Sequence, residues 1–265
     1  MTQMIETWIN DRWPLLLPEH RAVRPEWPWW EAARLASMYH ELVMTDETRS
    51  WNDDANNQFY VSPTGPREVI YDIGAEEGDL PALWSSWGCD VVLFEPNDRV
   101  WPNIKAIWEA NDLRPPLASI SGFAGPENRF LTEGHAVGIA AEEQEWPISA
   151  YGEIIGDHGF CNLSERPDIM SVMIDTVAEL TKPPTAITID VEGAEHEVLM
   201  GAQRVLAEHK PKVWVSIHRE FAQRMYDHPD VLEAIQDLMS SHGYPDDGRG
   251  EHLATDHEEH WVWLP

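Results

Sequence analysis

Basic residues are scarce in this chain of 265 residues. Lys and Arg together number 18, against 47 Asp and Glu, which gives a formal net charge of −29. A field of that sign repels phosphate backbones and anionic lipid, so we expect neither a nucleic-acid partner nor binding to a membrane surface. Solubility is the simplest reason for such a charge.

Cysteines and long apolar runs are also few. The two cysteines, Cys89 and Cys161, provide neither a disulfide framework nor a thiolate metal site. No apolar run approaches the ~20 residues of a membrane-spanning helix. The first residues, MTQMIETWINDRW, contain an acid and lack the basic region of a secretory signal. We therefore expect a cytoplasmic protein.

Tryptophan, by contrast, is abundant, and several of the 14 tryptophans lie in RPEWPWW (24–30). Such a stretch fits either a platform for a carbohydrate or partner, or a core between helices and a domain, and we favour the core. Apolar residues in EAARLASMYHELV (31–43) recur at helical spacing, so residues 1–62 are predicted to form an N-terminal helical, Trp-rich segment.

Strand and helix patterns alternate in residues 63–265. This alternation is typical of an α/β fold with a doubly wound, mostly parallel sheet. Residues 122–170 interrupt it with a segment rich in Gly, Pro and acids, which we interpret as an insertion such as a lid or a binding loop. Strand-like runs fall at 68–74, 89–96, 117–121, 185–190 and 212–218, and the final HEEHWVWLP is expected to close the sheet edge.

The first strand-to-helix turn, DIGAEEGD, is a candidate ligand site because ligands bind beyond the carboxyl ends of parallel strands. Gly74 would allow a tight turn close to a ligand, and Gly78 would let the helix start close to the strand. Asp72 precedes both glycines. Glu95, at the end of the second strand and followed by Pro96, is placed to accept both hydroxyls of a ribose.

Two ligands fit this arrangement, a dinucleotide and S-adenosylmethionine. A dinucleotide site is marked by Gly-x-Gly-x-x-Gly, which this turn lacks, and Glu76 and Glu77 would repel phosphate. S-adenosylmethionine has no phosphate and carries a sulfonium and an ammonium group, which nearby acids suit. An ordinary turn without a ligand is the plain alternative, but together with Glu95 the pattern favours a methyltransferase.

Three segments carry a family resemblance: VIYDIGAEEGDL, VVLFEPN and ITIDVEGAEHEVLMGAQRVL, in that order. They resemble the motifs of the FkbM family of S-adenosylmethionine-dependent methyltransferases, over about residues 67–220. The resemblance implies a class I methyltransferase (Rossmann-like) fold and methylation of a hydroxyl on a sugar, glycan or glycosylated metabolite. Thr188 stands where the family usually has Lys, and Ser216 where it often has Glu. Neither residues 1–62 nor the insertion is covered, so the acceptor's identity does not carry over.

Acids and a histidine at the ends of two later strands are candidates for activating the acceptor. We expect Asp190 and His218 to be catalytic, with His218 as general base, because imidazole titrates near neutral pH. Alternatively, Asp190, Glu192 and His218 hold Mg²⁺ or Mn²⁺. Glu195 is either functional or a carboxylate favoured at a helix start by the macrodipole.

Three further interpretations stay open at this stage. His257 and His260 in DHEEH lack the spacing of a zincin helix, and we expect His257 to line the acceptor pocket. One rival to a methyltransferase is an NAD-dependent Rossmann oxidoreductase. The other is a non-catalytic S-adenosylmethionine-binding module, which the departures at Thr188 and Ser216 motivate. No pattern in the sequence indicates an oligomeric state.

Overall fold

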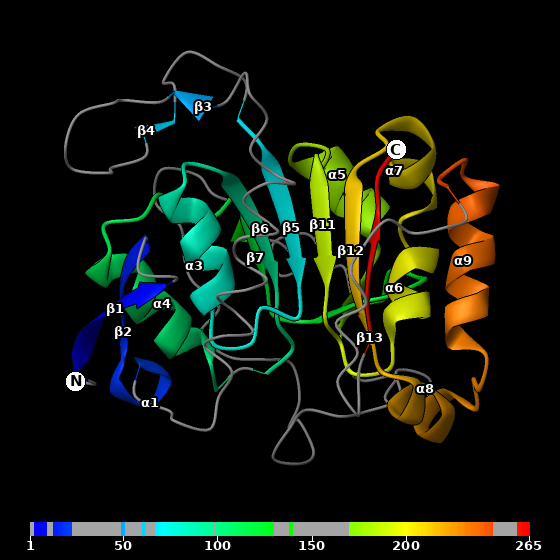
Figure 1. Ribbon diagram of the computed structural model, residues 1–265, viewed down its shortest axis with the longest axis horizontal. Helices are drawn as coiled ribbons and strands as arrows, with labels where there is room; N and C mark the ends of the chain where they lie inside the picture. The colour runs from blue at the N-terminus through cyan, green and yellow to red at the C-terminus, as the bar shows by residue number, and fades with distance from the viewer. Residues whose placement is uncertain are drawn as a thin grey trace.

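The computed structural model describes residues 3–9, 13–22, 67–97, 99–129, 170–245 and 259–265, and the backbone of three two-residue strands. Its described strands include a seven-stranded sheet in the order β13, β12, β11, β5, β6, β7, β9 (Figure 1). The five strands from β12 to β7 are parallel, whereas β13 and β9 run antiparallel to their neighbours. This topology confirms the predicted doubly wound α/β fold, and β13 closes one edge as expected. The strands of this sheet are β5 (Val69–Ile73), β6 (Asp90–Phe94), β7 (Ala118–Ile120), β9 (Gly138–Ile139), β11 (Ala186–Ile189), β12 (Lys212–Ile217) and β13 (Glu259–Trp263).

Helices cover both faces of this sheet (Figure 1). Two of them, α3 and α4, pack on one face, and α5, α6, α7 and α9 contribute to the core on the other face. The helical stretch that follows β11 is divided into α6 and α7 at Gly201 and Ala202. A side chain at Gly201 would meet the carbonyl oxygen of Gly125 at 2.1 Å. The helices of this layer arrangement are α3 (Asp79–Ser86), α4 (Trp101–Ala110), α5 (Ile174–Leu180), α6 (Glu195–Met200), α7 (Gln203–Glu208), α8 (Arg219–Tyr226) and α9 (Val231–Ser241).

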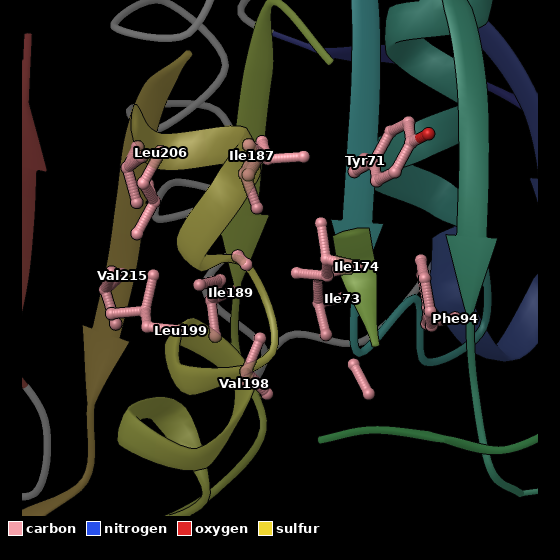
Figure 2. Close-up of a cluster of buried hydrophobic side chains, with 14 of the residues drawn as sticks. Tyr71, Ile73, Phe94, Ile174, Ile187, Ile189, Val198, Leu199, Leu206 and Val215 are labelled. Atoms are coloured by element: carbon pink, nitrogen blue, oxygen red, sulfur yellow. The ribbon is translucent and has the colours of Figure 1, made fainter. Parts of the chain in front are cut away.

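The core follows the two-residue period of the strands. In β5, Ile70 packs toward α3 and α4, while Tyr71 and Ile73 belong to the cluster on the opposite face. Figure 2 shows this second cluster, in which Ile73 and Phe94 lie on the same side of the sheet as Val198 of α6. Each fully buried aliphatic or aromatic side chain contributes about 1.5–3 kcal/mol, so these two clusters fix the strand ends on which the site depends.

The N-terminal segment differs from the prediction. Residues 4–9 and 13–18 are not helical but form an antiparallel hairpin of β1 (Met4–Ile9) and β2 (Trp13–Pro18), and the short helix α1 (Glu19–Ala22) follows. In β2, Trp13, Leu15 and Leu17 alternate with more exposed residues and join the core of α3 and α4. The inward-facing side chains therefore recur at a period of two, which is typical of a strand and which the prediction of a helix did not take into account.

Several predictions concern residues outside the described ranges. They include the Trp-rich stretch 24–30, the helix over 31–43, the role of His257 and most of the insertion at 122–170. Next to that insertion, β8 (Phe123–Ala124) pairs in parallel with β10 (Ser171–Val172). Two further strands, β3 (Arg49–Ser50) and β4 (Tyr60–Val61), pair antiparallel with each other. Within the described ranges, none of the helices has the length and apolar character needed to cross a membrane.

The order of the strands reverses between β5 and β11. From β5 the chain proceeds to β6 and β7 on one side, and the later strands β11 and β12 lie on the other side. The carboxyl ends of β5 and β11 therefore flank the switch point, where ligands of open α/β sheets bind.

Candidate active site

The turn after β5 lies directly against the residue that follows β11. Gly74 has a φ of 94°, and its N–H donates to the carbonyl oxygen of Phe94 at 3.0 Å. A Cβ at Gly74 would lie 1.9 Å from the carbonyl oxygen of Asp190. The predicted tight turn is confirmed, and its close neighbour is the backbone of Asp190.

Gly78 has a different neighbour from the one predicted. It precedes α3 with a φ of 85°, and a Cβ there would meet the side chain of Ile104 at 2.9 Å. The tight approach that the structure shows at this glycine is therefore between the start of α3 and the helix α4, not between α3 and its strand.

Glu95 lies at the end of β6, buried, with both carboxylate oxygens hydrogen bonded. The backbone N–H of Glu76 donates to Oε2 at 2.8 Å, and that of Asn97 donates to Oε1 at 2.7 Å. Burial raises the pKa of Glu95 to about 8 although these two bonds lower it. Glu95 thus ties the loop after β5 to the loop after β6, and the half-buried Pro96 follows it.

Thr188 of β11 is paired with Asp72 of β5 across the two strands. Its hydroxyl donates to Asp72 Oδ1 at 2.8 Å, and both side chains are buried. Burial raises the pKa of Asp72 to about 7, and Asp190 and Asp79 add to the rise, against the lowering effect of Thr188. The residue that departs from the family pattern therefore has a defined partner at the switch point.

His218 follows β12, and its ring lies between two carboxylates. Its Nδ1 is 2.9 Å from Oε1 of Glu195, and its Nε2 is 3.7 Å from Oδ1 of Asp190. Asp190 and His218 follow two strands, as predicted, and these strands, β11 and β12, are neighbours in the sheet. The two carboxylates differ in environment: the side chain of Asp190 is 57% exposed, and that of Glu195 is 0% exposed.

The full burial of Glu195 decides the alternative left open by the sequence. Its Oε1 also accepts a hydrogen bond from the N–H of Gly193 at 2.9 Å, whereas its Oε2 is buried without a partner in the described part of the chain. A carboxylate that only complements the helix dipole needs no buried side-chain partner. Glu195 is instead a buried partner of His218. The signal that sequence reasoning missed is the preceding Gly193, with a φ of 111°, where a Cβ would meet the backbone of α8 at 2.8 Å.

Glu192 is half-buried beside this pair, in the left-handed region with a φ of 55°. Burial raises its pKa to about 7, and Asp190 adds to the rise. In the described ranges, no three or more His, Cys, Asp or Glu form a group that could hold a metal ion. This geometry therefore gives no support to the metal site at Asp190, Glu192 and His218, which stays a prediction.

Ser216 of β12 and His260 of β13 form a buried pair. Ser216 Oγ lies 2.9 Å from Nδ1 of His260, across the antiparallel pairing of these strands. His260 is thus part of the sheet, as the strand prediction implies. Ser216, the second departure from the family pattern, has a structural partner as well.

Arg21 of α1 is a residue of the site that the sequence did not indicate. Its guanidinium donates two hydrogen bonds to Oδ2 of Asp79, at 2.6 and 3.0 Å. It also donates one to each carboxylate oxygen of Glu76, at 3.2 and 3.0 Å. Its neighbour His20 contacts Glu77. The N-terminal segment therefore contacts three acids between β5 and the start of α3 through two side chains, those of His20 and Arg21.

Comparison with known proteins supplies the family. The family model described as Methyltransferase FkbM domain matches residues 72–245. Methyltransferase FkbM from Methylobacillus flagellatus KT has a similar structure, with 16% identity and a TM-score of 0.46, covering 89% of this chain but only 54% of that protein. TYW2 from M. jannaschii in complex with AdoMet has 11% identity and a TM-score of 0.44, with coverage of 99% and 85%. The tRNA (uracil-54, C5)-methyltransferase from Pyrococcus abyssi, in complex with S-adenosyl-L-homocysteine, has 11% identity and a TM-score of 0.47, with coverage of 99% and 44%.

No curated protein matches this chain. The family model, however, extends over more than half of its length and includes the loops after β5, β6, β11 and β12 that build the site. The chain belongs to the FkbM methyltransferase family.

Proposed function

We propose that this protein is an S-adenosylmethionine-dependent O-methyltransferase that methylates a hydroxyl of a sugar, glycan or glycosylated metabolite. The family gives the reaction class, and the contact of His218 with a buried and an exposed carboxylate is the observation that supports transfer to a hydroxyl. When bound, S-adenosylmethionine supplies an electrophilic methyl group on a sulfonium, so the remaining requirement is a nucleophilic acceptor.

The residues at the switch point fit this cofactor. Four carboxylates there, those of Asp72, Glu76, Glu95 and Glu192, have raised pKa values, each chiefly because of burial. Such a set of acids favours a cationic ligand and disfavours a pyrophosphate, which argues against the dinucleotide alternative. Each oxygen of Glu95 uses one lone pair for a backbone N–H and keeps another, so the carboxylate can still accept ribose hydroxyls.

His218 is the proposed general base. An ionised Glu195 can only accept a hydrogen bond, so Nδ1 of His218 carries the proton and Nε2 carries the basic lone pair. Nε2 points toward the exposed side chain of Asp190, where an acceptor hydroxyl can approach. When Nε2 takes up the hydroxyl proton, the ring becomes positive between two negative groups, which stabilises that state.

A sugar acceptor is supported by the resemblance to the family and by the charge of the chain. The net charge of −29 disfavours a nucleic acid as acceptor. The cytoplasmic location expected from the composition stays a prediction, as does the role of the insertion at 122–170 as a lid. Thr188 and Ser216, whose departures from the family pattern motivate the non-catalytic alternative, both have partners in the fold, and the test of that alternative is methyl transfer itself.

Two substitutions test the proposed chemistry. A panel of sugars and glycosides is first screened for methyl transfer from labelled S-adenosylmethionine. With the best acceptor, Asp190→Asn and His218→Ala should each lower turnover by ~10²-fold or more, the usual effect of losing a general base. Their affinity for S-adenosylhomocysteine should stay close to that of the wild type. Normal turnover in both variants would remove these residues from the mechanism.

A further inference from the structure

The loop after β5 is held from a part of the chain that lies outside the family match. Arg21 precedes the matched residues 72–245, yet it is only 3% exposed, and its guanidinium bridges Glu76 and Asp79. Burial works against the charge of this side chain, but Asp79 and Glu76 outweigh it, so the pKa of Arg21 is raised. Arg21 of α1 thus places a permanent positive charge against the acidic loop after β5.

The hairpin that precedes Arg21 has contacts of its own with α3 and α4. The side chain of Asn111, at the end of α4, accepts a hydrogen bond from the N–H of Leu16 at 2.7 Å and donates to its carbonyl oxygen at 2.8 Å. On the same hairpin, the ring of Trp13 packs 5.1 Å from that of Trp87. The hairpin is therefore anchored to α3 and α4 independently of the ion pairs made by Arg21.

Glu76 connects Arg21 to the proposed ribose site. Its side chain accepts two hydrogen bonds from Arg21, and its own backbone N–H donates to Oε2 of Glu95. Glu76 also has a φ of 47°, a left-handed conformation that costs a residue with a Cβ free energy and needs support from its surroundings. The bidentate contact with Arg21 supplies such support, because the planar fork fixes the carboxylate in two directions.

We propose that Arg21 is a positioning residue for cofactor binding: it holds Glu76, and through the backbone of Glu76 it holds the carboxylate of Glu95. This inference rests on the proposed function, because it assumes that Glu95 binds the cofactor. It means that the segment 13–22, outside the family domain, is needed for full cofactor affinity.

The acidic surroundings of Glu76 give the inference a pH signature. Glu76 is faced by Arg21 from α1, Asp79 from α3, Glu95 after β6, and Asp190 and Glu192 after β11. The side chain of Glu76 is 53% exposed, so burial raises its pKa only where the carboxylate faces the protein, and Arg21 is the partner that lowers it. Without Arg21, its pKa rises further, and an ionised Glu76 is repelled by the neighbouring acids with no cation to hold it in place. Affinity should then fall as pH rises.

Calorimetric titration with S-adenosylhomocysteine tests this. Arg21→Met should weaken binding by about tenfold or more, and the ratio of its Kd to that of the wild type should grow as pH is raised from about 6 to about 9. Arg21→Lys keeps the charge but lacks the fork, so it should fall between the two. Adding Glu76→Gln to Arg21→Met should remove the extra pH dependence, because the amide does not titrate, but it should not restore the affinity of the wild type, because the fork that holds this side chain is still missing.

Asn111→Ala is the matched control, because it weakens the docking of the hairpin but leaves the ion pairs of Arg21 in place. It should lower the Tm without changing the Kd. If Arg21→Met lowers the Tm but binds S-adenosylhomocysteine like the wild type at every pH, Arg21 is only structural and the inference is overturned. Should Arg21→Met not fold, the same comparison of Tm and Kd is made with Arg21→Lys. If the folded wild type itself fails to bind S-adenosylhomocysteine, the proposed function fails first.

Discussion

The charge of Glu195 is expected to control turnover through the ring of His218. Glu195→Gln keeps the size of the side chain and an acceptor oxygen for the N–H of Gly193, but it removes the charge. A hydrogen bond to a charged partner contributes about 1.5–3 kcal/mol, against about 0.5–1.5 kcal/mol for a neutral one. The variant therefore loses about 1–1.5 kcal/mol when His218 holds the proton of the acceptor, which lowers kcat by about five- to tenfold.

The same substitution has a separate cost in stability. The amide nitrogen would take the place of Oε2, which is buried without a partner in the described ranges, so its N–H groups would find no acceptor there. The free energy of unfolding should fall by about 1–3 kcal/mol. Chemical denaturation measures this loss, and kcat is then compared at a temperature where both proteins are fully folded.

The assay for this prediction is methyl transfer from labelled S-adenosylmethionine to the acceptor found in the sugar panel, at saturating concentrations of both. Glu197→Gln is the control. Glu197 lies in the same helix and also has a pKa raised by burial, but the histidine that affects its pKa is His228. It should keep the kcat of the wild type. A folded Glu195→Gln variant with unchanged kcat would refute the assignment of Glu195 as the partner that orients and stabilises His218.

Three further predictions follow from the site. Gly74→Ala should lower the free energy of unfolding by more than about 1 kcal/mol, because its φ is strained for Ala and the new Cβ would clash with the carbonyl of Asp190; unchanged denaturation curves would contradict this. Unfolded carboxyls titrate near ~4, whereas burial raises the pKa of Asp72 to about 7 and that of Glu95 to about 8. The folded state therefore binds more protons in between, and the Tm should fall as pH rises from about 6 to about 8, with a smaller slope in Glu95→Gln. A chelator should leave methyl transfer unchanged if, as proposed, His218 is the base and no metal takes part; activity lost on chelation and restored by Mg²⁺ would contradict that proposal.

The central sheet could be predicted because its strands are short apolar runs separated by helical patterns. The period of two in β5, for example, places Ile70 on one face and Tyr71 on the other, and such a pattern needs no tertiary information. The turn at Gly74 and the acid at the end of β6 followed from the same reading. Each of these features depends on residues close together in the sequence.

The parts that could not be predicted depend on contacts between distant residues. Glu195 satisfies the local rule for a helix start, but its partner His218 is 23 positions away, and burial against that ring decides its role. Arg21 pairs with Glu76 and Asp79 across 55 and 58 positions. Nothing in its immediate neighbours marks it. For the hairpin at residues 4–18, the periodic signal was present, but the helical pattern at 31–43 was extended over it.

The binding of the cofactor tests the account most directly. The wild type and Glu95→Ala are titrated by calorimetry with S-adenosylmethionine, S-adenosylhomocysteine and NAD. We predict that the first two bind to the wild type and NAD does not, and that Glu95→Ala weakens binding by about ten- to a hundredfold, the equivalent of hydrogen bonds to a charged acceptor. Absence of binding to the folded wild type, or equal affinity in Glu95→Ala, would contradict the assignment of the switch point as the cofactor site.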